Sequence, residues 1–230
     1  MIYLMKDRME PEQQELVCRM LPAWKQEKLD RIRNERARTQ SICAWALLFY
    51  GLRTRYGRES WPPLTEGPHG KPEFCSKEGE QPLHFSLSHT EGAVMCVLTD
   101  RPVGADIQKI PPYRERTVRY YASEQEYRIL QERENPTMEA ALLWTMKEAY
   151  LKYLGTGISS RLPDLDFSGV LLSGKVSESA GLSFYGLHFQ TGAWGDSLYT
   201  VCGLEEEEAP LVLEEESIMG VFRSCPAILR

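Results

Sequence analysis

Two acidic side chains and a lysine form the clearest chemical pattern in this sequence. Asp106 lies in a short alternating segment, while Glu148 and Lys152 lie four residues apart in a segment with helical spacing. Because helical residues advance by about 100° each, Lys152 falls within about 40° of Glu148 on one face. Two carboxylates can hold magnesium against phosphate oxygens. Spacing alone also allows a plain surface ion pair, which contributes only about 0.2–0.5 kcal/mol.

Residues 103–108 are expected to form a strand with Gly104, Asp106 and Gln108 on one face. We interpret this face as exposed, with the glycine leaving room for a ligand to approach the backbone. The amide oxygen of Gln108 lies two residues from Asp106, a spacing that suits one small cation. A strand-end aspartate that is satisfied by a turn is the alternative.

Further side chains have types that bind phosphate. Lys71 follows a glycine and precedes a proline, and Ser88 and His89 are adjacent in a second alternating segment. Neighbours on a strand point to opposite faces, so this pair is poorly arranged for a hydrolase. Lys147 lies in the apolar arc of the helix and must reach solvent or find an anionic partner. Phosphate-binding glycine motifs and a nucleophile elbow do not occur.

The elements around these residues indicate an α+β fold. Helical spacing covers residues 24–56 and 136–154, with Gly155 as a C-cap, and a capping box joins Ser123 to Glu126. Strands are expected at residues 84–89, 93–98, 103–108, 169–172, 183–189 and 197–204, and a proline-rich loop at 61–72. The expected domains are an N-terminal half (1–102), a C-terminal half (103–204) and an acidic extension (205–230), which we expect to be disordered or loosely docked.

Composition sets the wider limits. The net charge is −6, yet residues 19–58 hold ten Lys or Arg and three acids. This stretch predicts an anionic partner or else a solvated helix face. A nucleic-acid binder is the weaker alternative, because no recognition module occurs. The scattered cysteines indicate reduced thiols, and no signal peptide or membrane span is recognised. We therefore expect a cytoplasmic protein that binds neither membrane nor nucleic acid.

Four blocks in order carry a family resemblance. They are GKP at 70–72, FSLSH at 85–89, VGADI at 103–107, and WTMKEAYLK at 144–152 followed by GTG at 155–157. Together they resemble the 4′-phosphopantetheinyl transferase superfamily, in particular its larger, single-chain Sfp type. The resemblance spans residues 24–170 and does not extend to the tail.

The resemblance implies a fold and an activity. Two similar α+β halves would pack as a pseudo-dimer in a monomeric chain, with coenzyme A in the cleft between them. The activity would be magnesium-dependent transfer of the phosphopantetheine arm of coenzyme A to a serine of an acyl or peptidyl carrier protein, releasing 3′,5′-adenosine diphosphate.

The resemblance also assigns roles to residues. Asp106, Gln108 and Glu148 would hold magnesium, and Asp106, Glu148 and Lys152 would form the catalytic set. The residues expected to contact coenzyme A are Lys25, Lys28, Arg38, Lys71, Ser88, His89 and Lys147. The family commonly has a glutamate where this chain has Gln108, an amide that cannot serve as a base. This departure is the one feature that favours the alternative, a non-catalytic module that binds coenzyme A or a carrier protein.

Overall fold

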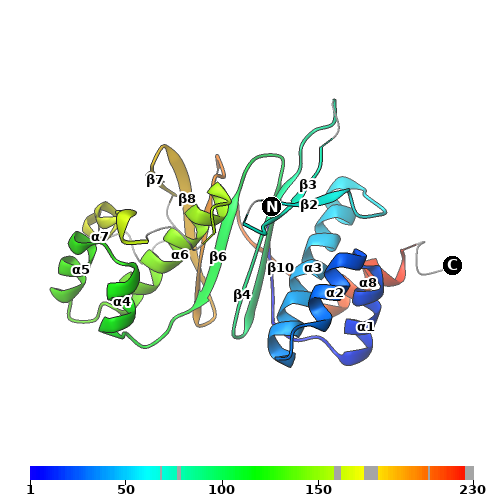
Figure 1. The fold of residues 1–230 in the computed structure, drawn as a ribbon, viewed down its shortest axis with the longest axis horizontal. Helices are drawn as coiled ribbons and strands as arrows, with labels where there is room; N and C mark the ends of the chain where they lie inside the picture. The colour runs from blue at the N-terminus through cyan, green and yellow to red at the C-terminus, as the bar shows by residue number, and fades with distance from the viewer. Residues whose placement is uncertain (68, 77–78, 158–161, 174–180, 207, 226–230) are drawn as a thin grey trace. The chain divides into compact units, whose positions relative to one another are not determined.

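A computed structural model describes the chain except for residues 68, 77–78, 158–161, 174–180, 207 and 226–230 (Figure 1). The chain forms two compact units. Unit 1 comprises Met1–Thr65, Pro72–Asp100 and Glu208–Arg230, and unit 2 comprises Glu66–Lys71 and Arg101–Glu207. Each unit combines helices with a four-stranded sheet, which confirms the α+β class.

In unit 1 a long helix packs on a sheet of order β10-β1-β5-β4. The strands are β1 (Ile2–Met5), β4 (His84–Thr90), β5 (Ala93–Thr99) and β10 (Leu211–Val212). The helices are α1 (Pro11–Met20), α2 (Ala23–Asp30), α3 (Glu35–Tyr56) and α8 (Glu215–Arg223). All described residues of β5 are buried except Thr99, which agrees with the continuous apolar run expected there.

The single helix expected at residues 24–56 is two helices. The chain leaves helical geometry after Arg31, and Asn34 begins α3 by accepting a hydrogen bond from the Ala37 N–H at 2.9 Å. The expected loop at 61–72 contains one short strand, β2 (Leu64–Glu66), and ends at the first residue of another, β3 (Pro72–Phe74), and the two strands pair as a ribbon.

In unit 2 the sheet has the order β6-β9-β8-β7 and is antiparallel throughout. Its strands are β6 (Gly104–Lys109), β7 (Gly181–Phe184), β8 (Leu187–Trp194) and β9 (Ser197–Cys202). Helix α6 (Thr137–Leu154) lies against β6 and β9. The remaining helices are α4 (Glu115–Tyr121), α5 (Glu124–Gln131), the short 3₁₀ turn η1 (Leu162–Asp164) and α7 (Ser168–Ser173).

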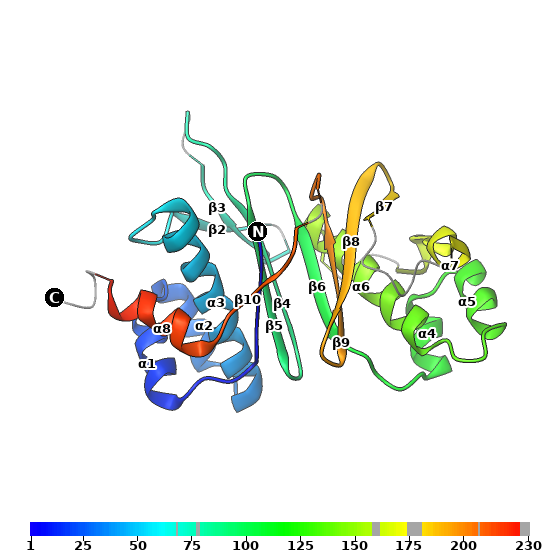
Figure 2. The same cartoon turned by 180° about the vertical axis from the view of Figure 1, so that it is seen from behind.

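Local signals fix the ends of two helices in unit 2. Ser123 and Glu126 form the expected capping box at the start of α5. Gly155 ends α6 with φ of 70°, a left-handed conformation that glycine adopts without strain. Helices α4, α5 and α7 gather on the side of α6 away from β6, as Figures 1 and 2 show. The strand expected at 169–172 is wrong, because these residues belong to α7.

The C-terminal segment is also different from the expectation. Its described part is not a loose acidic extension, because β10 pairs with β1 in parallel and α8 buries Ile218, Met219 and Phe222. These three apolar residues recur at helical spacing, a signal that the acidic residues before them obscured. Residue 207 and residues 226–230 of this expected extension lie outside the described part of the chain.

Each unit has its own apolar core. In unit 1 the core joins α3 to β5 and α8, and in unit 2 it joins α6 to α7, β8 and β9. All six cysteines are free thiols, as expected. Among the described helices, none is both long enough and apolar enough to cross a membrane.

Candidate active site

Gly104 allows helix α6 to lie directly on strand β6. A side-chain carbon at this position would lie 2.0 Å from the Ala149 carbonyl oxygen and 2.3 Å from the Tyr153 nitrogen, distances that no real contact allows. Glycine is therefore the residue that permits this close approach. The interpretation of this strand face as exposed is wrong, because α6 covers it and buries both Gly104 and Asp106.

The close approach brings Asp106 against the last turns of α6. The Lys152 ammonium lies 2.7 Å from Asp106 Oδ1, and the Asp106 side chain is only 7% exposed while that of Lys152 is 29% exposed. A carboxylate with so little access to water needs a positive partner. The expected neighbourhood of Asp106 and Lys152 is therefore present.

Glu148 completes the cluster from one turn earlier on α6. Its side chain is buried, and no described residue donates a hydrogen bond to its Oε1. The pKa of Glu148 is raised to about 7, mainly by burial and additionally by the negative charge of Asp106, while the positive charge of Lys152 opposes the shift. Lys152 contacts Asp106, and Glu148 lies one turn before Lys152 on α6, so the three groups from two distant stretches of the sequence are neighbours in unit 2.

This donor set fits a small divalent cation. The buried Glu148 Oε1 and the repulsion between two carboxylates are both relieved when a cation binds, and carboxylate oxygens are the ligands that magnesium prefers. Within the described part of the chain, no three His, Cys, Asp or Glu side chains cluster as a metal site. The Gln108 amide is a candidate for a third protein ligand. The amide nitrogen of Gln108 donates to the Lys109 carbonyl at 3.1 Å.

Lys71 belongs to the same unit as this cluster. Its ammonium donates to the Lys152 carbonyl at 2.6 Å and to the Val103 carbonyl at 3.3 Å. It therefore joins the end of α6 to the residue that precedes β6. The structure places Lys71 beside the backbone of Lys152, and its contact with phosphate stays a prediction.

Five expected contacts of coenzyme A lie in unit 1 instead. The Lys25 ammonium donates to Ser41 Oγ at 2.8 Å and lies over the Trp45 ring, and that of Lys28 lies over the Trp24 ring. Arg38 lies 3.9 Å from the Cys18 sulfur. On β4, Ser88 is buried and His89 is exposed, as alternation requires. The binding roles of these five residues stay predictions.

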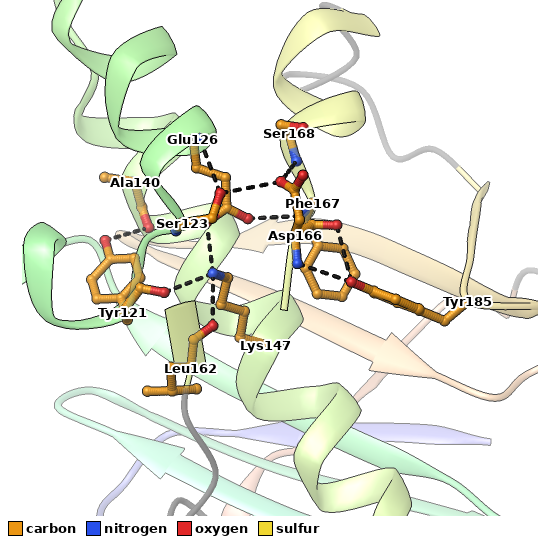
Figure 3. Close-up of polar contacts among 10 residues, drawn as sticks. All are labelled: Tyr121, Ser123, Glu126, Ala140, Lys147, Leu162, Asp166, Phe167, Ser168 and Tyr185. Atoms are coloured by element: carbon orange, nitrogen blue, oxygen red, sulfur yellow. Dashed lines mark hydrogen bonds and ion pairs between the residues drawn. The ribbon is translucent and has the colours of Figure 1, made fainter. Parts of the chain in front are cut away.

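Lys147 has a different place from the one expected. Its side chain is 0% exposed, and its ammonium donates to Glu126 Oε2, the Tyr121 carbonyl and the Leu162 carbonyl (Figure 3). The need for an anionic partner is confirmed, and Glu126 is that partner. An ammonium has three N–H donors, and protein oxygens accept all three. The structure thus gives Lys147 a structural role in place of a contact with coenzyme A.

A pocket of about 420 Å³ opens beside Gln108, between the segment around α4 and one face of α6. Its lining includes Gln108, Tyr113, Arg114, Tyr121, Ala141 and Trp144. The lining is mostly apolar, with Arg114 as a cation. Sequence reasoning missed this pocket, because the segment at 110–122 has no regular pattern that predicts its path.

Comparison with known proteins agrees with the geometry. Residues 102–202, which include Asp106, Glu148 and Lys152, match the 4′-phosphopantetheinyl transferase superfamily. The chain is 36% identical over 98 residues to the 4′-phosphopantetheinyl transferase Sfp of Bacillus subtilis, covering 41% of this chain and 42% of that protein. It is 30% identical over 143 residues to the 4′-phosphopantetheinyl transferase psf-1 of Bacillus pumilus, covering 61% and 51%.

A third relative matches over a longer stretch. The L-aminoadipate-semialdehyde dehydrogenase-phosphopantetheinyl transferase of Saccharomyces cerevisiae is 26% identical over 200 residues, which cover 82% of this chain and 73% of that protein. The chain matches about half or less of the length of the two bacterial relatives. Through residues 102–202, with their acidic pair and its lysine, the chain is similar to the 4′-phosphopantetheinyl transferase superfamily.

Proposed function

We propose that the protein transfers the 4′-phosphopantetheine arm of coenzyme A to a serine hydroxyl of a carrier protein. The observation that carries this proposal is the buried cluster of Asp106, Glu148 and Lys152, which lies within the stretch that matches the superfamily. The carboxylates of Asp106 and Glu148 and the ammonium of Lys152 suit phosphoryl transfer, because that reaction needs its developing negative charge on phosphate oxygens to be stabilised.

Asp106 and Glu148 are the residues that would hold magnesium, with Gln108 as the third ligand. A bound magnesium ion would neutralise charge that develops on the pyrophosphate of coenzyme A. Lys152 is partly exposed, so its ammonium can contact a phosphate oxygen while it remains beside Asp106. Lys25, Lys28, Arg38, Lys71, Ser88 and His89 are the proposed contacts for the nucleotide and its phosphates.

Glu148 is the proposed acceptor of the serine proton. Gln108 cannot accept a proton, and Asp106 is already engaged by Lys152. The serine oxygen then attacks the β-phosphorus of coenzyme A, the bond to the bridging oxygen breaks, and 3′,5′-adenosine diphosphate leaves with that oxygen. Positioning of the two reactants supplies much of the acceleration.

We further propose that the carrier protein contacts the pocket beside Gln108. Gln108, which lines the pocket, lies on the same strand as Asp106. The mostly apolar lining suits an apolar side chain of the carrier, and Arg114 suits an acidic protein surface around it. This position would bring the carrier close to Glu148. We also propose a cytoplasmic location and a monomeric state, on the basis of the sequence.

The direct test is a transfer reaction with fluorescent coenzyme A. The protein is incubated with magnesium and either a bacterial apo acyl carrier protein or an apo carrier domain of L-aminoadipate-semialdehyde dehydrogenase, the enzyme in the yeast relative's name. We expect label on at least one carrier, loss of transfer in chelator, and recovery when magnesium is restored. Transfer that is insensitive to chelator would contradict the metal assignment.

The same experiment separates the alternative, a non-catalytic module. Gln108 favours this alternative, because an amide weakens a metal site that commonly has a third carboxylate. Binding of coenzyme A with no covalent label on any carrier would support the module and reject the enzyme.

A further inference from the structure

The buried Lys147–Glu126 pair connects four segments of unit 2. From α6, the Lys147 ammonium donates to Glu126 Oε2 and to the Tyr121 carbonyl, each at 2.6 Å, and to the Leu162 carbonyl at 3.1 Å. These acceptors lie on α5, at the last residue of α4, and in η1. Figure 3 shows the amine at the centre of these contacts. One side chain thus fixes the distances between α6 and three other elements.

Glu126 extends the connections on its own side. Its Oε2 accepts a hydrogen bond from the Ser123 N–H at 2.6 Å, and its Oε1 accepts one from the Phe167 N–H at 2.7 Å (Figure 3). The Glu126 side chain is 0% exposed. The carboxylate therefore closes the start of α5 and also holds the residue that precedes α7.

The hydrogen bonds of the pair described above go to α4, α5, η1 and the residue before α7. Lys147 points about 100° away from Glu148 around α6, toward α4 and α5 and away from β6. Any effect on the reaction must therefore pass through the elements that the pair connects.

Tyr121 provides that connection. Its carbonyl accepts from Lys147, its hydroxyl donates to the Ala140 carbonyl at 2.8 Å, and its ring meets the Trp144 ring at 5.3 Å with an edge-on geometry. Tyr121, Ala140 and Trp144 all line the pocket beside Gln108. The ion pair thus holds the α4 wall of the pocket against the helix that carries Glu148.

The segments around α6 are held together by a buried ion pair where apolar side chains could also have filled the space. A buried ion pair is costly to desolvate, and apolar residues of similar size often stabilise a protein as well or better. Directed hydrogen bonds from the pair to four other protein groups, however, define one arrangement of the surrounding segments, whereas apolar packing allows several.

We propose that Lys147 and Glu126 are positioning residues, which set the α4 wall of the pocket relative to α6 so that the carrier serine is presented to Glu148. This inference rests on the proposed function. It predicts that loss of the pair impairs the use of the carrier protein much more than the binding of coenzyme A, because none of the residues proposed to contact coenzyme A belongs to the pair or to α4.

The test replaces both charges together, with Lys147→Met and Glu126→Leu in one chain. The single Lys147→Met variant leaves Glu126 buried without its cation and is expected to be unstable, whereas the double variant removes both desolvated charges and is expected to fold. We expect the KM for the apo carrier to rise about tenfold or more, while the KM for coenzyme A stays within about twofold. Arg223→Met, which removes a cation from an exposed ion pair on α8, is the control and should leave both KM values unchanged.

Hydrogen exchange supplies a readout that does not depend on activity. At equal global stability, peptides from residues 115–131 of the double variant should exchange about tenfold faster than in the wild type, while peptides from β8 and β9 stay unchanged. A folded double variant with unchanged carrier KM and unchanged exchange would overturn the inference. If the wild type labels no carrier, the proposed function fails, and the exchange comparison still decides whether the pair positions α4.

Discussion

At the scale of single residues, the proposed reaction depends on Asp106, Glu148 and Lys152, which lie together where α6 packs on β6. Helical spacing placed Glu148 and Lys152 on one face of a helix, and strand alternation placed Asp106 and Gln108 on one face of a strand, but the family resemblance was needed to group Asp106 with Glu148 and Lys152. Helical spacing could not identify the partner of Lys147, because it gives the face of the helix on which a residue lies but not the element that packs against that face. Glu126 was recognised only as part of a capping box, and its second role depends on contacts with residues 147 and 167 that no local pattern encodes.

The raised pKa of Glu148 predicts a pH-dependent stability. Because the folded pKa of about 7 exceeds the ordinary value of 4.5 for a glutamate, the folded protein binds this proton more tightly than the unfolded chain. The stabilisation is complete below about pH 4.5 and is lost as the pH rises through 7. In chelator, the free energy of unfolding of Glu148→Gln should therefore gain about 1–3 kcal/mol relative to the wild type between pH 5 and pH 8. Denaturant unfolding at both pH values measures this gain, and a pH-independent difference would contradict the assigned environment.

Gln108 allows a second test at this scale. Gln108→Glu adds a negative charge two residues from Asp106 on the same strand, and a third carboxylate should strengthen magnesium binding. We expect the magnesium concentration at half-maximal transfer to fall by about tenfold. An unchanged or weaker metal requirement would show that the Gln108 side chain does not face the ion.

At the scale of elements, the site is made by the contact of α6 with β6. The sequence predicted both elements within two residues, but it did not predict that they touch. Gly104 was interpreted as space for a ligand, whereas that space is filled by the backbone of α6. The segment at 169–172 illustrates a related limit, because a short apolar run between small residues is compatible with either a strand or a helix.

Gly104→Ala should separate these two elements. A methyl group would overlap the Ala149 carbonyl, so we expect a loss of about 1–3 kcal/mol or more in the free energy of unfolding, together with loss of transfer. Gly220→Ala is the control, since a side chain there meets nothing within 4 Å on a helix, and alanine should stabilise α8 by about 0.5–1 kcal/mol. Thermal unfolding distinguishes the two, and a neutral Gly104→Ala would contradict the close contact of α6 with β6.

At the scale of the whole molecule, the C-terminal segment belongs to the first unit. Strand β10 pairs with β1 from the opposite end of the sequence, and Phe222 of α8 contacts Phe49 of α3 with ring centres 5.1 Å apart. The sequence did not predict this pairing, because a two-residue strand has no pattern and the preceding glutamates suggested a solvated tail.

This arrangement predicts that α8 stabilises unit 1 alone. Phe222→Ala should cost about 3–5 kcal/mol in the stability of that unit, because the ring is fully buried. Hydrogen exchange should accelerate in α3 and β5 and remain unchanged in β8 and β9. Glu216→Ala, on the exposed face of α8, should have little effect. An undisturbed α3 in Phe222→Ala would show that α8 is not part of the core.

The central claim, that Asp106 and Glu148 act together in the transfer reaction, is tested most directly by the rate of arm transfer in single variants. Asp106→Ala and Glu148→Ala should each lower the rate of carrier labelling by about a thousandfold or more, with circular dichroism unchanged. Glu139→Ala, an acidic residue of α6 that pairs with Arg133 outside the cluster, should transfer at the wild-type rate. A folded Glu148→Ala protein that labels the carrier at nearly the wild-type rate would contradict the account.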